Sequence, residues 1–307
     1  MNGDAGIGAE LGDLGLAVPD EHLSRWKEHT YVIRSCELVL SETADPKPGS
    51  SLAQVDALYR WEKVSAWTRS YLQAATEHLG LWADRVAPYA FDPNAPVLVR
   101  IRPYLLLGRS GLEAAAHALW LFEVPTKTHV ECIQRFVRLM YRDFGYHRDA
   151  LTAHGDDTTL IEQRIADLEQ RADNLPFETA PRNTPPGYER LVRHAAEVTG
   201  RDANQWSYLW QAASGAGHGQ NWFSIEGFDL LHRSEYEPGH YRAVSIPDPA
   251  FVTDLIGAAA HALQWATCRW LLNAGYEPDL LARAVLEISA RMPKTNPSTS
   301  ESGSSTR

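Results

Sequence analysis

The sequence predicts an all-α protein, a multi-helix bundle with a long Pro-rich loop and a disordered C-terminal tail. Apolar residues recur at helical spacing along most of the chain, which indicates amphipathic helices. Several of these segments begin with Ser or Thr followed three residues later by Gln or Glu, the capping-box pattern of a helix start. With 44% hydrophobic and 22% charged residues, the composition is that of an ordinary globular protein with an ample core.

The first part of the chain is expected to contain four helices separated by turns and prolines. Ser51 and Gln54 form a capping box for the clearest amphipathic helix, and Thr128 and Glu131 form a second one. The predicted segments are a helix over 19–40, a loop over 44–50, a long helix over 51–79, a proline break over 88–96, a helix over 103–122, and a helix with one basic face from 128 to about 144.

The second part is expected to be helical with one irregular stretch. Thr159 and Glu162 open a polar helix, and Gly200 suits the left-handed cap that ends a later helix. The predicted segments are helices over 159–174, 188–199, 204–213, 251–272 and 278–292, a loop with four prolines over 176–187, and an irregular stretch over 217–249 with at most a short extended piece at 240–246.

We expect a single domain over residues 19–292, with possible halves at 19–175 and 188–292. Residues 1–18 are rich in Gly and acidic side chains, and we expect a flexible terminus there. Residues 293–307 contain Ser, Thr, Gly and Pro without a large apolar side chain, so burial cannot offset the entropy of ordering them. The tail is therefore expected to be disordered.

Composition and charge exclude several classes of protein. The N-terminus lacks the basic and apolar regions of a secretion signal, so a cytoplasmic location is expected. The longest apolar run, Tyr104–Phe122, is interrupted by charged and polar residues, which argues against a membrane span. A net charge of −10 disfavours non-specific binding to nucleic acid.

Cysteine usage argues against a disulfide scaffold and against a metal centre. Cys36, Cys132 and Cys268 are odd in number, far apart and placed on apolar helix faces, so we expect reduced core residues. Closely spaced Cys or His pairs, which structural zinc usually requires, do not occur. We therefore expect no metal and no cofactor.

The first polar cluster is Arg109, Glu113 and His117 within the apolar helix. Helical spacing places Arg109 and Glu113 on one face, among leucines and alanines, so both are expected to be buried with partners on another helix. Two interpretations are open: a structural ion pair that fixes helix register, or a ligand site in which Arg109 clamps an anion and Glu113 or His117 accepts a proton.

The second cluster surrounds a Gly-rich helix end and contains Tyr208, Ser214 and His218. Gly215, Gly217 and Gly219 let another backbone or a ligand approach closely, although a capped helix terminus is the alternative interpretation. The glycine spacing fits neither type of phosphate-binding loop. We expect Arg109 and His218 to line one shared pocket.

Arg142 and His147 form a third candidate, an R-x-x-x-x-H spacing at the end of the basic helix. In metal-independent RNA cleavage, a His can act as acid or base while an Arg stabilises the phosphorane charge. Gly145 lies between the two residues and disfavours a single helix that carries both.

The order of these motifs resembles bacterial helical-bundle proteins grouped near the HEPN superfamily, over roughly residues 50 to 290. The resemblance is carried by an apolar helix with Arg109 and Glu113, a helix ending in Tyr208 to His218 with Ser214, an irregular stretch, and two closing helices. It implies a bundle that often forms dimers. It also implies, for members with R-x-x-x-x-H, ribonuclease activity of the toxin or defence type, here through Arg142 and His147.

The function expected from the sequence is a ligand-binding or partner-binding module. Its pocket is expected to contain Arg109, Glu113, His117, Tyr208, Ser214 and His218, with a small anionic ligand or a protein as partner. The alternative is a metal-independent ribonuclease, with RNA as partner only in that case. Trp-rich helices could leave apolar surface to bury, so a homo-oligomer is expected.

Overall fold

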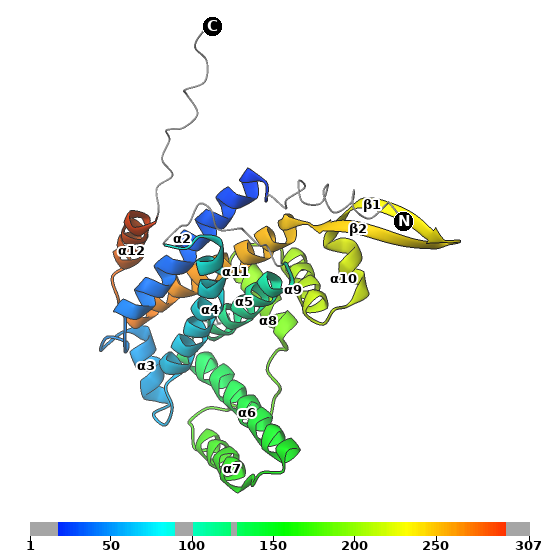
Figure 1. Ribbon diagram of the computed structural model, residues 1–307. Coiled ribbons are helices and arrows are strands. Elements are labelled where there is room, and N and C mark those ends of the chain that lie inside the picture. The colour runs from blue at the N-terminus through cyan, green and yellow to red at the C-terminus, as the bar shows by residue number, and fades with distance from the viewer. Residues whose placement is uncertain (1–17, 90–100, 124–127, 293–307) are drawn as a thin grey trace.

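Helices surround one central helix in a bundle, and a β-hairpin projects from it (Figure 1). The computed structural model describes residues 18–89, 101–123 and 128–292. Its elements are α2 (Asp20–Glu42), α3 (Ser51–Leu58), α4 (Val64–Val86), α5 (Ile101–Phe122), α6 (His129–His154), α7 (Thr159–Asp173), α8 (Tyr188–Val198), α9 (Ala203–Gly217), α10 (Asn221–Glu226), β1 (Phe228–Glu237), β2 (His240–Pro247), α11 (Pro249–Ala274) and α12 (Asp279–Arg291). The all-α class is confirmed.

The central helix is α5, which packs against α4 and α11 and also contacts α8 and α9. It is the apolar segment that the sequence marks most clearly, and an almost continuous set of its side chains is buried. A helix that is apolar on most sides is stable only inside a protein. The core around it holds large aromatic side chains, among them Trp82, Trp270, Tyr59 and Phe136.

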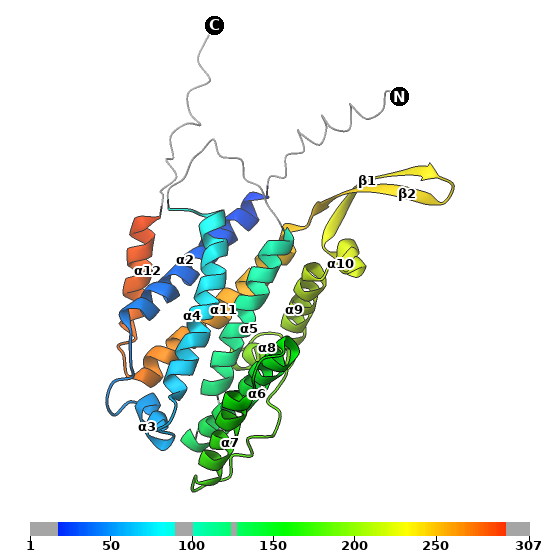
Figure 2. The same ribbon diagram turned by 60° about the horizontal axis from the view of Figure 1, so that its bottom comes forward.

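Helices α6 and α7 extend beyond the rest of the bundle (Figures 1 and 2). Thr128 caps α6 as expected, with its hydroxyl accepting from the Glu131 amide at 3.3 Å. The helix continues through Gly145 and ends at Gly155 in the left-handed conformation. The prediction that Gly145 separates Arg142 from His147 is therefore wrong, because packing of the apolar face outweighs the weak helix propensity of one glycine.

The long helix predicted from residue 51 is two helices, and its cap is Ser50 rather than Ser51. The break follows from Asp56, whose carboxylate accepts from the Ser65 amide at 3.1 Å and from its hydroxyl at 2.6 Å. A side chain of α3 thus caps the start of α4. Tyr59, fully buried at the break, holds the turn against the core.

Helix α9 is longer than predicted, since it continues through Ser214, Gly215 and Gly217. A Cβ on Gly215 would lie 2.7 Å from the Trp222 ring, and one on Gly217 would lie 2.4 Å from Leu106. The expected close approach at these glycines is therefore made by side chains of the same chain. No ligand is needed to explain the glycines.

The stretch before α11 is more ordered than the sequence suggested. Strands β1 and β2 pair antiparallel, and β2 covers the short extended piece expected at 240–246. Strand β1 was not predicted, because its residues do not alternate cleanly between apolar and polar, and bulges interrupt its register near Leu231 and Tyr236.

The flexible N-terminus, most of the proline break at 88–96 and the disordered tail that the sequence predicts lie outside the described residues. Cys36, Cys132 and Cys268 are free thiols, and Cys36 and Cys132 are buried as expected, whereas Cys268 is partly exposed. Among the described helices, none is long and apolar enough to cross a membrane.

Two helix glycines should respond oppositely to alanine. A Cβ at Gly111 would lie 2.6 Å from Cγ of the fully buried Leu79, whereas nothing lies within 4 Å of one at Gly145. We expect Gly111→Ala to destabilise the fold by about 1 to 3 kcal/mol through overpacking. Gly145→Ala should stabilise it by about 1 kcal/mol through helix propensity. Urea unfolding monitored by circular dichroism measures both, and equal effects would contradict the packing described for α5.

Candidate functional site

His117 is buried and forms the centre of a polar cluster between α5 and α6. Its Nδ1 lies 2.8 Å from the Glu113 carbonyl oxygen, and its Nε2 lies 3.1 Å from Nη2 of Arg142. A guanidinium can only donate, so Nε2 must carry the lone pair and Nδ1 the proton. The ring also stacks on Tyr71 with 4.8 Å between centroids and meets the edge of Tyr188.

The surroundings keep this imidazole neutral. Burial, together with the smaller effect of the Arg142 charge, lowers the pKa of His117 to about 4 against the opposing effect of its hydrogen bond to the Glu113 carbonyl. Burial also raises the pKa of Tyr71 to about 12. Near neutral pH the cluster therefore holds a neutral imidazole and a neutral phenol beside a charged guanidinium.

Glu113 joins this cluster to α9. Its Oε1 accepts from Arg109 Nε at 2.8 Å and from Trp210 Nε1 at 2.6 Å. Arg109 also donates to the Ser214 hydroxyl at 3.1 Å, and its guanidinium lies over the Trp210 ring at 5.0 Å. The structure thus brings Arg109, Glu113 and Ser214 together, with the partners on another helix that the sequence predicted.

Two predicted pocket residues lie elsewhere. Tyr208 precedes Trp210 by two residues, so it projects about 200° away around α9. It contacts Glu226 and Phe251 instead, on α10 and α11. His218 is the exposed C-cap of α9. Tyr208 therefore does not join Arg109 in one pocket, because it lies on the opposite face of α9 from Trp210, which contacts Arg109.

Arg142 and His147 are both on α6, but five residues place their side chains about 140° apart around the helix. The Arg142 guanidinium is held by His117 and by the Pro186 carbonyl at 2.8 Å. His147 is exposed. The histidine that contacts Arg142 is therefore His117, and the ribonuclease alternative stays a prediction from the sequence.

The basic face of α6 binds the Pro-rich segment 176–187. Gln134 donates to the Glu178 carbonyl at 2.6 Å, and Arg138 Nε donates to the Thr179 carbonyl at 3.3 Å. With Arg142 on Pro186, three side chains of one helix hold this segment by its carbonyl groups. Ala180 has a φ of 45°, which is a strained backbone conformation for a residue with a side chain. The contacts on both sides of Ala180 can maintain this conformation.

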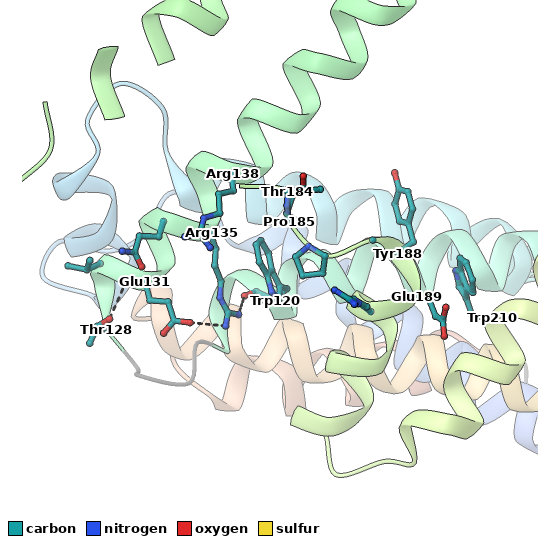
Figure 3. Close-up of a pocket in the computed structure, with 15 residues that line it drawn as sticks. Trp120, Thr128, Glu131, Arg135, Arg138, Thr184, Pro185, Tyr188, Glu189 and Trp210 are labelled. Atoms are coloured by element: carbon teal, nitrogen blue, oxygen red, sulfur yellow. Dashed lines mark hydrogen bonds and ion pairs between the residues drawn. The ribbon is translucent and has the colours of Figure 1, made fainter. Parts of the chain in front are cut away.

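A cleft of about 1090 Å³ lies between this segment, the first turns of α6, the end of α5, the start of α8 and the middle of α9. Figure 3 shows Arg135 and Arg138 entering it from α6, Trp120 at its centre, and Tyr188 and Trp210 further along. Its lining residues are Trp120, Thr128, Val130, Glu131, Gln134, Arg135, Arg138, Thr184, Pro185, Pro186, Gly187, Tyr188, Glu189, Arg190 and Trp210.

A smaller cavity of about 280 Å³ borders His117 directly and includes Tyr71 and Arg142. Tyr188 and Glu113 connect the two regions: Tyr188 lines both the cleft and the smaller cavity, while Glu113 lines the cavity and bonds to Trp210 of the cleft. The polar cluster around His117 therefore supports one end of the cleft. Within the described ranges, no group of three or more His, Cys, Asp or Glu side chains could hold a metal ion.

Sequence reasoning missed several residues of this site, namely Tyr71, Arg138, Tyr188, Arg190 and Trp210. One signal was present, because Trp210 and Ser214 are four residues apart and so share a face of α9. Tyr188 and Arg190 reach the site because the Pro-rich segment before them packs against α6, and the sequence gives no signal of that tertiary contact.

The fold and this site define an α-helical bundle with a buried neutral histidine beside an arginine-rich and aromatic cleft. Comparison with known proteins gave no match to a protein-family model, a curated protein or a solved structure.

Proposed function

We propose that the protein is a binding module for a small organic anion with a planar apolar part, and that the ligand binds in the cleft beside Trp120. The part-buried network of Arg109, Glu113 and Arg142 around the buried His117 supports the cleft wall instead of contacting the ligand. This proposal keeps the anionic ligand expected from the sequence. It moves the ligand from Arg109 and His218 to the neighbouring arginines.

The observation that carries the proposal is a pair of incompletely bonded guanidinium groups in the cleft. Arg138 donates a hydrogen bond only through Nε, to the Thr179 carbonyl, and the Arg190 side chain is exposed. Across the described part of the chain, the terminal nitrogens of Arg138 and the whole Arg190 guanidinium have no hydrogen-bond or ion-pair partner. A planar guanidinium with free N–H groups is well suited to a carboxylate, phosphate or sulfonate.

Arg135 serves a different purpose in the same cleft. It is buried and donates to the Trp120 carbonyl, to the Glu123 carbonyl at 3.3 Å and to the Glu131 carboxylate at 2.9 Å. It also lies over the Trp120 ring, 5.0 Å from the centroid. Arg135 therefore fixes the cleft floor and the Trp120 ring, and the anion is left to Arg138 and Arg190.

The size and walls of the cleft favour an organic anion over an inorganic ion. Ligand pockets of drug-sized molecules occupy roughly 300 to 1000 Å³, and this cleft is of that order. Trp120, Tyr188 and Trp210 supply aromatic surface, and Tyr188 is 41% exposed. Aromatic side chains fix a planar ligand while the arginines determine its charge.

The test uses the fluorescent anion 1-anilinonaphthalene-8-sulfonate as probe, with the folded protein near pH 7. We expect Arg138→Gln and Arg190→Gln each to weaken binding about five- to tenfold, since each removes one charge-assisted contact at a partly exposed site. The matched control is Arg164→Gln, an exposed arginine on α7 outside the cleft.

A second probe separates the anion from the ring system. N-phenyl-1-naphthylamine has the same rings without the sulfonate, and its affinity should not respond to either cleft variant. Equal affinity of wild type, Arg138→Gln and Arg190→Gln for the sulfonate would contradict the proposal. So would an equal loss in Arg164→Gln, which would indicate a general effect of charge.

A further inference from the structure

The β1–β2 hairpin projects away from the helices (Figures 1 and 2). Almost all of its side chains are exposed, including large apolar ones at Leu230, Leu231, Tyr236 and Tyr241. It is a sheet of two strands, so each strand has one edge without a β partner among the described residues. A two-stranded hairpin is marginally stable in water by itself, and three or more strands are usually needed.

The charged side chains of β1 are ordered so that two antiparallel copies of this strand would place opposite charges beside each other. Arg233 and Glu235 flank Ser234 in a regular part of the ladder, where their cross-strand neighbours are Ala243 and Tyr241. Residues two apart in a strand point to the same face. Within the described chain, neither Arg233 nor Glu235 forms an ion pair. The Arg233 guanidinium lies over the Tyr241 ring at 3.7 Å, and Glu235 Oε1 accepts from the Gly239 amide at 2.7 Å, so pairing with a second copy must compete with these contacts.

We propose that a second copy of this chain docks on the hairpin, with the two β1 strands pairing antiparallel about a two-fold axis at Ser234. In that register, Arg233 of each copy lies directly opposite Glu235 of the other, so one symmetric contact forms two ion pairs. The two hairpins then make one four-stranded sheet in the order β2-β1-β1-β2, which satisfies the backbone groups along the paired edges of the two β1 strands.

The other edge does not offer the same complementarity. Strand β2 contains Arg242 and no carboxylate, so antiparallel self-pairing there would bring together cations without an acidic partner. The projection of the hairpin also reduces repulsion between the two copies, each of which carries a net charge of −10. Contact through projecting hairpins keeps the bulk of that charge apart, and screening in physiological salt acts over about 8 Å.

A charge-swap series on the full chain, measured by sedimentation equilibrium, tests the proposal. Wild type should be a dimer. Arg233→Glu and Glu235→Arg should each weaken the dimer at least about tenfold, because each places like charges opposite one another twice. The double variant Arg233→Glu/Glu235→Arg restores opposite charges in both pairs and should restore the dimer.

The register is tested separately with Ser234→Cys. Residues directly opposite in an antiparallel pair have Cα atoms about 4.5 to 5.5 Å apart, which suits a disulfide. Oxidised Ser234→Cys should give a covalent dimer on a non-reducing gel, whereas the control Ser245→Cys, exposed on β2, should not.

Four results would overturn the proposal: a monomeric wild type, dimers that persist in both single variants, a double variant that stays monomeric, or equal cross-linking at both cysteines. Circular dichroism of each variant shows whether the bundle is intact. Since the hairpin lies outside the helical core, a helical spectrum close to that of wild type is expected throughout.

Discussion

Lowering the pH from 6.5 to 4 should reduce the free energy of unfolding by about 3 kcal/mol through His117. Its pKa falls from 6.5 in the unfolded chain to about 4 in the folded protein. Between these values the unfolded state binds the proton and the folded state does not. Stability from this group is therefore complete above pH 6.5, decreases as the pH falls, and is lost below about pH 4.

The groups that face the His117 ring explain why its pKa is lowered instead of raised. Protonation would put a charged imidazolium against the Arg142 guanidinium and remove the lone pair that accepts its N–H. Tyr71 and Tyr188 cover the ring, and Glu113 offers its carbonyl to Nδ1 while its carboxylate bonds to Arg109 and Trp210. Asp143 lines the adjacent cavity, and burial raises the pKa of its carboxyl.

Urea unfolding of wild type and His117→Gln at a series of pH values measures this effect. Glutamine keeps an oxygen that can accept from Arg142 but does not titrate. The difference in unfolding free energy between the two proteins should change by about 3 kcal/mol between pH 6.5 and pH 4, because wild type loses more stability in acid than His117→Gln does. Burial also lowers the pKa of His29, His194 and His261, and these groups cancel in the difference. Parallel curves would contradict the neutral, buried His117.

The helices were largely predictable because their signals are local. Thr128 caps α6 as its capping box indicated, and Gly200 takes the expected left-handed conformation after α8. Apolar periodicity located α5, which then became the centre of the bundle. In these places the residues that decide the structure are neighbours in the sequence.

Predictions failed where a distant residue decides the structure. The break between α3 and α4 depends on Asp56, which caps a helix that begins eight residues later. The glycines of α9 accommodate Trp222 and Leu106, so the residues that explain them lie on other elements. Strand β1 is not visible in the sequence because bulges disturb its alternation.

The candidate site was half predictable for the same reason. Arg109 and Glu113 share a helix face by spacing, and that pair is confirmed. The contact between Arg142 and His117 joins two helices, and no spacing rule connects those positions. The R-x-x-x-x-H spacing instead pairs Arg142 with His147, which is near in sequence but lies on another side of α6.

Glu113→Leu should destabilise the fold by about 2 to 4 kcal/mol. The substitution leaves the Arg109 guanidinium and the Trp210 N–H without their acceptor in the interior, and breaking a buried pair from one side costs roughly 3 to 5 kcal/mol. The pair is not fully buried, with side chains 21% and 18% exposed, so part of that penalty is relieved by water. Thermal or urea unfolding near pH 7 measures the loss.

The double variant Arg109→Met/Glu113→Leu distinguishes the two interpretations of this pair. If the pair only fixes helix packing, replacing both charges with apolar side chains should recover much of the stability, because no uncompensated charge remains. Sulfonate binding in the cleft should then persist, since Arg138 and Arg190 are unchanged. A double variant as unstable as Glu113→Leu would contradict the pairwise account. A stable double variant that no longer binds the probe would place Arg109 or Glu113 in contact with the ligand, as the sequence first suggested.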